Sequence, residues 1–388
     1  MKIAIIGAGI AGAAAAFEIA RQGGRASVFH DLVGSSGLYS GALDFELWDQ
    51  AEQGSALASE LSEFSKQLGA WELGAVPRRV ATLEGNLRPA RGADSALLDL
   101  ERCAGKRVAV IELERDDWDA PLLAKSFASN AWALQTQTQF FAARAKVLQE
   151  GFERRISSYD FAALHDAPAR AQALQAALRE SGVSAGAWLF GPWLGIARPL
   201  AQELSAALGV PVGETTSAPG GVAGARFEQA RDRLLGRIAP LERGRLTRIE
   251  RHGSGYRLQL QGGETREFAV VVLATGGVAA GGVALERSFE RRGGTGFRLS
   301  FAAPVALELD AEVVEGVSSL SSIDFAERGL GALLKVGIAT QTDGSVLGNP
   351  GIFVAGDAIA GRPRTALIAA RSGLEAARAA LAYCRRSG

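Results

Sequence analysis

The amino terminus carries the pattern that most restricts the fold of this chain. An apolar run of strand length, Met1–Ile6, leads into the hexapeptide GAGIAG at positions 7–12, and a small-residue stretch follows at 13–22. A second apolar run, Ala26–Phe29, ends at His30. Strand, glycine turn, helix and strand in this order predict a βαβ unit that binds a dinucleotide.

Each glycine of the hexapeptide has its own physical reason. Gly7 permits a tight turn, Gly9 lets the backbone approach a pyrophosphate, and Gly12 lets helix and strand pack closely. The negative pyrophosphate would lie against the N–H groups of Ile10 and Ala11 at the positive end of the helix. A plain turn in an α/β sheet is the alternative, because 48 glycines make chance matches common.

The end of the second predicted strand departs from the dinucleotide pattern. An Asp or Glu at this place accepts hydrogen bonds from a ribose, whereas position 30 is His. Asp31 is the next acceptor along the chain; otherwise the ribose end is held differently or is missing. We therefore treat His30 and Asp31 as candidate cofactor residues.

Residues 33–44 follow as a small, hydroxyl-rich loop without hydrophobic periodicity. Behind a nucleotide-binding strand, such a loop offers backbone N–H groups and serine hydroxyls to a cofactor. Ser36, Ser40 and Gly41 are the candidate cofactor residues of this loop. A surface connection without a ligand is the alternative.

Residues 46 to about 240 carry no nucleotide-binding signal. The apolar pattern predicts a buried strand at 108–111 and helices at 51–68, 121–148, 167–180 and 225–235. An aromatic patch at 188–195 is more typical of a core than of a site. We interpret the segment as an inserted α+β substrate or cap domain.

A second glycine-rich signal lies farther along the chain. Alternating runs at 246–251 and 256–260 predict a β-hairpin, with His252 in its surface turn. A buried strand at 268–273 then leads into the tetrapeptide ATGG. This stretch adds the candidate cofactor residues Ala274, Thr275 and Gly276.

The third signal is a strand near the carboxyl terminus that ends in Gly356 and Asp357, before a small-residue helix at 363–381. An acid at this place can accept hydrogen bonds from sugar-alcohol hydroxyls. The helix N-terminus would face a phosphate or a ring edge. Gly356 and Asp357 therefore join the candidate cofactor residues.

The order of these three signals resembles that of the flavoprotein dehydrogenases of the glutathione-reductase-like fold. The signals are an N-terminal GxGxxG, a hairpin followed by ATGG, and a C-terminal VAGD. The resemblance implies an α/β chain with a Rossmann-like flavin-binding domain. That domain has three layers (ββα) and combines a parallel sheet with a β-hairpin or meander. In that fold the N-terminal unit holds the adenosine diphosphate half of FAD, and Gly-Asp holds the ribityl-phosphate half. We expect a discontinuous flavin domain at 1–45, 241–285 and 331–388, and a substrate, cap and partner-interaction domain at 46–240 and 286–330.

Three stretches look more specifically like one family, that of the second subunit of anaerobic glycerol-3-phosphate dehydrogenase: SGLYSGALD at 36–44, LATGGVAAGGV at 273–283 and IFVAGD at 352–357. That family implies a flavin-bearing subunit that works with a catalytic flavoprotein subunit and an iron–sulfur subunit at the membrane. Electrons would pass from glycerol 3-phosphate to quinone. The family is usually described with FMN, whereas the motifs here indicate FAD, so FMN is the alternative cofactor.

Oxidation of an alcohol by a flavin needs a base for the hydroxyl proton. Among the 3 histidines, His165 in the middle segment is the candidate base, with a core or surface role as the alternative. Arg364 is the candidate for gripping a phosphate or carboxylate, with a solvated arginine as the alternative. The lack of a convincing base favours an electron-carrying subunit. A stand-alone FAD-dependent oxidase or dehydrogenase of a small hydroxy or amino acid, and an assembly subunit with a degenerate flavin site, are the alternatives.

Composition limits the partners. The chain has 42 basic and 42 acidic residues, so its net charge gives no signal for nucleic acid or an anionic membrane surface. Two cysteines without a CxxC spacing offer no iron–sulfur or zinc ligand set, so we expect no metal. No uncharged run is long enough to span a membrane. We expect a cytoplasmic protein that meets the inner membrane, if at all, through a partner subunit.

Overall fold

The computed structural model describes residues 2–31, 33–43, 56–288, 298–302, 306–307 and 336–387. The chain divides into two compact units. Unit 1 contains Met1–Ser36 and Arg231–Gly388, and unit 2 contains Gly37–Ala230. The division falls after residues 36 and 230, where the sequence suggested 45 and 240. Most of the segment 286–330 lies outside the described residues, so its assignment to the cap domain stays a prediction.

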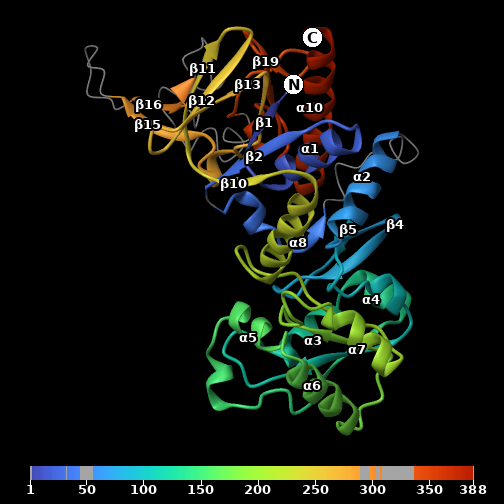
Figure 1. The fold of residues 1–388 in the computed structure, drawn as a ribbon. Helices are drawn as coiled ribbons and strands as arrows, with labels where there is room; N and C mark the ends of the chain where they lie inside the picture. Colours follow the sequence, from blue (N-terminus) through green and yellow to red (C-terminus); the bar gives the residue numbers. More distant parts are fainter. Residues whose placement is uncertain are drawn as a thin grey trace. The chain divides into compact units, whose positions relative to one another are not determined.

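Unit 1 is built on a six-stranded sheet with the order β10-β2-β1-β14-β19-β18 (Figure 1). Neighbours pair in parallel from β10 to β19, and β18 runs antiparallel to β19. The order changes direction at β1, and ligands of open α/β sheets bind at such switch points. The strands are β1 (Ile3–Ile6), β2 (Ala26–His30), β10 (Leu241–Arg243), β14 (Val270–Leu273), β18 (Ser345–Val346) and β19 (Asn349–Val354).

The two faces of β1 serve two different layers. Ile3 and Ile5 are buried together with apolar residues of helices α1 (Ile10–Arg21) and α10 (Ala366–Ser387). Ala4 and Ile6 are buried against a second sheet of order β13-β12-β11-β17. Successive side chains of a strand point to opposite faces, so the four apolar residues of β1 pack against the helices on one face and against the second sheet on the other. This arrangement confirms the predicted three-layer ββα architecture.

The second sheet of unit 1 contains the predicted hairpin. β11 and β12 pair antiparallel, with His252 opposite Gly255 at the turn, which confirms the hairpin. A separate antiparallel pair, β15 with β16, follows β14. The strands of these sheets are β11 (Leu246–His252), β12 (Gly255–Leu260), β13 (Thr265–Phe268), β15 (Ala284–Ser288), β16 (Arg298–Ala302) and β17 (Ala306–Leu307).

Helices α1 and α10 lie side by side in unit 1 (Figure 1). Small residues allow this close approach. A Cβ at Gly373 of α10 would lie 2.2 Å from the carbonyl oxygen of Ala11 in α1. The glycines of the chain therefore also bring the first and last described helices together.

Unit 2 has two sheets of different kinds. A parallel sheet has the order β7-β6-β8-β9, and an antiparallel sheet has the order β3-β5-β4. The sequence indicated β6 but not the parallel sheet. The strands are β3 (Ala42–Leu43), β4 (Trp71–Ala81), β5 (Leu87–Asp94), β6 (Arg107–Glu112), β7 (Gln139–Arg144), β8 (Ala187–Phe190) and β9 (Val212–Glu214).

The helices of unit 2 include α2 (Ala56–Leu68), α5 (Ser158–Leu164), α6 (Pro168–Glu180) and α7 (Leu200–Leu208). α8 (Val222–Ile238) begins in unit 2 and ends in unit 1. Trp188, Phe190 and Trp193 are buried in the largest apolar cluster of this unit. The prediction that these aromatics belong to a core is confirmed.

The prediction of one helical stretch at 121–148 is wrong. The structure has α3 (Ala120–Ala128), α4 (Ala131–Thr136) and strand β7 in its place. Asn130 starts a new helix because its side chain accepts a hydrogen bond from the N–H of Trp132. Gln137, with φ 56°, ends that helix in the left-handed region. Propensity gave no sign of these two caps.

Candidate functional site

Three motifs far apart in the sequence meet at the carboxyl edge of the parallel sheet in unit 1. The N–H of Ala274 donates to the carbonyl oxygen of Ile6 (2.8 Å), and the N–H of Ala355 donates to that of Leu273 (2.8 Å). These bonds extend the ladders of β1 with β14 and of β14 with β19 by one residue. The segments that follow the three strands are therefore neighbours at this edge.

The glycine turn after β1 is closely packed. Gly7 has φ +108°, and a Cβ there would lie 2.1 Å from the carbonyl oxygen of Ala274. A Cβ at Gly12 would lie 1.9 Å from the carbonyl oxygen of Gly7. No other residue fits either place without moving the backbone, which supports the structural reasons inferred for Gly7 and Gly12.

Ser36 lies at the start of α1. The N–H of Ile10 donates to its Oγ (2.9 Å), and a Cβ at Gly9 would lie 2.9 Å from the same oxygen. The N-terminus of α1 has no acidic residue in its first turn. Ser36 thus places a hydroxyl at the positive end of the helix, where the sequence predicted a phosphate.

Asp357 follows β19 in a short 3-10 helix, η7 (Gly356–Ala358). Ser35 Oγ donates to its Oδ2 (3.1 Å). Burial raises the pKa of Asp357, against smaller opposing effects of Ser35 and Arg364. Gly356, with φ +71°, lies against α1, because a Cβ there would be 2.8 Å from the Cβ of Ala11. The predicted acid and the predicted helix start therefore belong to one local site.

Two buried polar atoms at this site have no hydrogen-bond partner in the described part of the chain: Thr275 Oγ1 and Arg364 Nε. Arg364 Nη2 donates to the carbonyl oxygen of Val336 (2.7 Å). A Cβ at Gly277 would lie 3.3 Å from Arg364 Cζ and 2.8 Å from the carbonyl oxygen of Asp357. A buried polar group without a partner costs about 1–3 kcal/mol. A ligand with hydroxyl and phosphate groups fits these atoms, because it offers acceptors to Arg364 and partners to Thr275.

Gly276 continues this packing. It has φ +81°, and a Cβ at Gly282 would lie 2.0 Å from its carbonyl oxygen. The turn after β14 is thus as tight as the turn after β1. Backbone, rather than side chains, forms much of this edge of the sheet.

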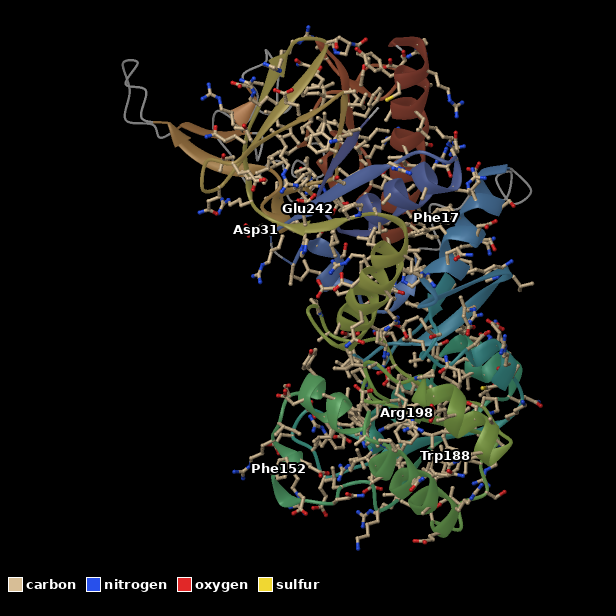
Figure 2. All side chains as sticks on the ribbon, viewed as in Figure 1. Phe17, Asp31, Phe152, Trp188, Arg198 and Glu242 are labelled. Atoms are coloured by element: carbon tan, nitrogen blue, oxygen red, sulfur yellow. The ribbon has the colours of Figure 1, made fainter. Side chains whose placement is uncertain are left out.

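His30 is the last residue of β2 and is partly buried, and Asp31 follows it. Figure 2 labels both Asp31 and Glu242, and the register of β10 with β2 places Glu242 opposite Phe29 and Arg243 opposite His30. Burial lowers the pKa of His30, and the guanidinium groups of Arg231 and Arg243 lower it further. A neutral imidazole has one acceptor nitrogen, so it can accept one hydrogen bond from a sugar hydroxyl.

Sequence reasoning missed Arg231 of α8. Its Nη1 donates to the carbonyl oxygen of Ala8, in the middle of the glycine turn (3.2 Å), across 223 positions of sequence. No local pattern around residue 231 marks this contact. The contact becomes visible only in the folded chain, where α8 precedes β10 and β10 pairs with β2.

The other two candidates of the serine loop belong to unit 2. The carbonyl oxygen of Ser40 accepts from the N–H of Ser217 (2.9 Å), and that of Gly41 accepts from the N–H of Asp94 (2.6 Å). A Cβ at Gly41 would lie 2.8 Å from Leu97 Cδ1. These contacts give both residues a structural role, and their predicted contact with a cofactor stays a prediction.

His165 caps the end of α5 inside unit 2. Only 2% of the residue is exposed, its Nδ1 bonds to the carbonyl oxygen of Trp193 (2.9 Å), and its ring packs edge-on against Phe161. Burial lowers its pKa to about 4. A general base must reach the proton of its substrate, so this enclosed position argues against the catalytic role suggested from sequence. The core role, which was the alternative, explains all of these contacts.

A second group of buried charges lies in unit 2. Arg226 Nη1 donates to Glu214 Oε2 (2.7 Å) and Asp94 Oδ1 (3.3 Å), and its Nη2 donates to the carbonyl oxygen of Gly195 (2.7 Å). These bonds join β5, β9 and α8. One guanidinium faces two carboxyl groups, and burial raises the pKa of both Asp94 and Glu214, so the charges of the group balance when one of the two carboxyls holds a proton.

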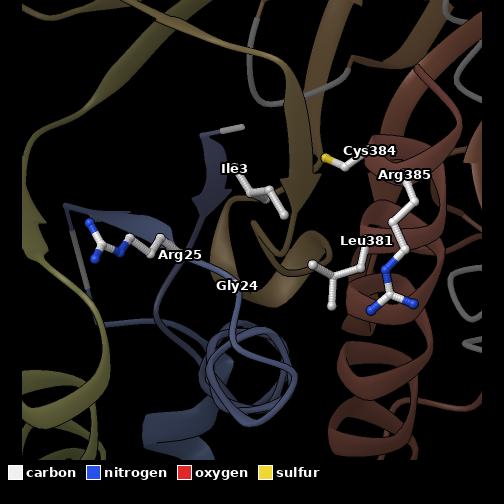
Figure 3. Close-up of a pocket in the computed structure, with 6 residues that line it drawn as sticks. All are labelled: Ile3, Gly24, Arg25, Leu381, Cys384 and Arg385. Carbon is white, nitrogen blue, oxygen red and sulfur yellow. The ribbon is translucent and has the colours of Figure 1, made fainter. Parts of the chain in front are cut away.

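A shallow apolar cavity of about 210 Å³ opens at the amino ends of β1 and β2, away from the motifs (Figure 3). Its lining is Ile3, Gly24, Arg25, Leu381, Cys384 and Arg385. Within the described ranges, no group of three or more His, Cys, Asp or Glu residues is placed to hold a metal ion. In the same ranges, no helix is both long and apolar enough to cross a membrane.

No protein-family model and no curated protein matches this sequence. Similar solved structures include glycine oxidase from Geobacillus kaustophilus, at 16% identity and a TM-score of 0.36 over 98% of this chain and 94% of that chain. CtdE in complex with FAD matches at 11% identity and a TM-score of 0.36 over 99% of this chain and 84% of that chain. The Diels-Alderase PyrE3 matches at 12% identity and a TM-score of 0.35 over 99% of this chain and 66% of that chain. TM-scores below 0.5 carry no conclusion about this chain, whose fold rests on its own strands and contacts.

Proposed function

We propose that this protein is an FAD-dependent oxidoreductase whose cofactor lies along the carboxyl edge of the parallel sheet in unit 1. One observation carries the proposal. The segments after β1, β14 and β19 converge there, and they include Asp357 and two buried atoms, Thr275 Oγ1 and Arg364 Nε, that have no hydrogen-bond partner among the described residues. A dinucleotide that carries a polyol chain supplies partners of the right kind for all three groups.

The chain's own residues would hold the cofactor in distinct ways. The N-terminus of α1 favours negative charge, so it suits the pyrophosphate. Asp357, with one oxygen accepting from Ser35, has acceptor capacity left for ribityl hydroxyls. Arg364 Nη2 donates to the carbonyl oxygen of Val336, which restrains the guanidinium, and its buried Nε, without a partner among the described residues, is a donor for the cofactor. A bound flavin supplies the acceptor for two electrons and a proton.

For the substrate and the assembly, we propose an electron-relaying subunit that passes electrons from glycerol 3-phosphate, or a similar small hydroxy substrate, to partner subunits and quinone. The similarity of three stretches to the second-subunit family of anaerobic glycerol-3-phosphate dehydrogenase supports this proposal. The enclosed position of His165 agrees with it, because that candidate base is shielded from any substrate. The partners would be a catalytic flavoprotein subunit and an iron–sulfur subunit, with membrane contact only through them.

Anaerobic reduction of the flavin-loaded protein tests this function. With glycerol 3-phosphate alone, we expect slow or no loss of the flavin absorbance, and fast loss when a catalytic partner subunit is added. Fast bleaching without any partner would contradict the relay role and favour a stand-alone dehydrogenase. If chemical reduction and reoxidation of the bound flavin prove impossible, an assembly role is the better explanation.

A further inference from the structure

We infer that Arg231 binds a phosphate group of the cofactor at the glycine turn, an inference that rests on the flavin site proposed above. The relevant chemistry is a phosphate ester of a flavin nucleotide. Neither the glycine motif nor the acid after β19 includes this residue, which comes from the middle of α8.

The contact with the turn is direct. Arg231 Nη1 donates to the carbonyl oxygen of Ala8, which lies between the two turn glycines, Gly7 and Gly9. The next N–H groups along the chain are those that the motif aims at a pyrophosphate. The guanidinium therefore lies within one or two peptide units of the expected anion.

The burial of Arg231 also points to an anion. Its side chain is 9% exposed, while its acidic partner Asp232 is 53% exposed and is bonded through a single oxygen, Oδ1. A buried guanidinium needs more compensation than a half-solvated carboxylate gives. Three of the five N–H donors of the guanidinium make contacts, Nη1 with Ala8 and both Nε and Nη2 with Asp232, so one N–H on each of Nη1 and Nη2 remains for a phosphate.

The charges near His30, at the end of β2, also support an anion at this place. Arg231 contacts the glycine turn through Ala8, and among the charges near His30 it is the one that most lowers the pKa of that residue, at the end of β2. The usual ribose acid is replaced there by His30, which therefore does not neutralise Arg231. The positive end of α1 and Arg231 together favour a ligand with negative charge at this place.

The test compares three flavins: FAD carries a pyrophosphate and an adenosine, FMN carries a single phosphate, and riboflavin carries neither, so FMN and riboflavin differ only in the phosphate. Their dissociation constants are measured by fluorescence titration for the cofactor-free protein, for Arg231→Gln and Arg231→Lys, and for Arg233→Gln. Arg233 is an exposed neighbour on the same helix and serves as the matched control. Loss of one charge-assisted hydrogen bond corresponds to about a 10- to 150-fold weaker affinity.

We expect Arg231→Gln to weaken FAD and FMN binding by that factor and to change riboflavin binding less than twofold. Arg231→Lys should recover part of the loss, and Arg233→Gln should resemble the wild type. An equal loss for all three flavins, or no loss for any, would overturn the inference and leave Arg231 as a brace for the turn.

Inorganic pyrophosphate provides a readout that does not depend on flavin binding. It should raise the midpoint of thermal unfolding of the wild-type protein and of Arg233→Gln, but not that of Arg231→Gln. If the wild type responds to pyrophosphate through Arg231 and yet binds no flavin, the proposed function fails while the phosphate site remains. If pyrophosphate stabilises the wild type and Arg231→Gln equally, the inference about Arg231 fails.

Discussion

Replacing Gly12 by Ala tests the close packing of the glycine turn against α1. The new Cβ would lie 1.9 Å from the carbonyl oxygen of Gly7 and 2.9 Å from its carbon. Both atoms belong to the backbone, so the helix and the turn must separate. Overpacking of this kind costs about 1–3 kcal/mol and occasionally more. A contact this short with backbone places the cost at the upper end.

Gly236 gives a matched control, because it also lies inside a helix, α8, and a Cβ there meets no atom of the described residues within 4 Å. Glycine to alanine in a helix gains about 1 kcal/mol from backbone propensity. Gly236→Ala should therefore stabilise the protein by up to that amount. Gly12→Ala has the same gain but a larger steric cost, so we expect net destabilisation of about 1–2 kcal/mol.

Urea unfolding of both variants and the wild type, followed by circular dichroism, measures these free energies. Gly12→Ala should also lower FAD affinity, because the turn that approaches the phosphate moves. If Gly12→Ala is as stable as Gly236→Ala, the close packing of the glycine turn against α1 is incorrect.

Three further outcomes are expected. Thr275→Val removes a buried hydroxyl that has no hydrogen-bond partner in the described part of the chain, so the cofactor-free protein should be equally or more stable. FAD binding to this variant should weaken by about 10-fold, as a titration beside the wild type would show. The stability of the cofactor-free protein should fall as the pH rises through the raised pKa of Asp357, because the folded state binds the proton of this carboxyl more tightly than the unfolded state does. Asp357→Asn should remove this pH dependence in thermal melts at a series of pH values. His165 makes the free energy of unfolding about 3 kcal/mol larger above pH 6.5 than at low pH, because its pKa is lower in the folded state, at about 4, than in the unfolded state. This contribution is lost as the pH falls from 6.5 toward 4. His165→Gln should flatten this pH dependence of stability. The rate of flavin reduction should stay within 10-fold of the wild-type rate, whereas loss of a general base would lower it by about 100-fold or more.

The sequence predicted the parts of unit 1 whose structure follows from local pattern. The β1–α1–β2 unit, the hairpin of β11 and β12, and the strand before Asp357 each carry periodicity or glycines that have few other uses. These elements were predictable because their cause lies within a few residues.

What could not be predicted depends on distant partners. Arg231 contacts Ala8 across 223 positions, and His165 is explained by Trp193 and Phe161. The split of 121–148 depends on the side-chain cap of Asn130, which resembles any other polar residue in a composition window. The pairing of Ser35 with Asp357 likewise requires the folded sheet.

Identification of the flavin that the purified protein releases tests the central proposal most directly. The protein is denatured, and the supernatant is separated by chromatography against FAD, FMN and riboflavin standards, with the flavin-to-protein ratio measured by absorbance. We expect FAD, at close to one molecule per chain after loading. Release of FMN alone would contradict binding of the adenosine half beside His30. No flavin, before or after loading, would contradict the proposed site itself.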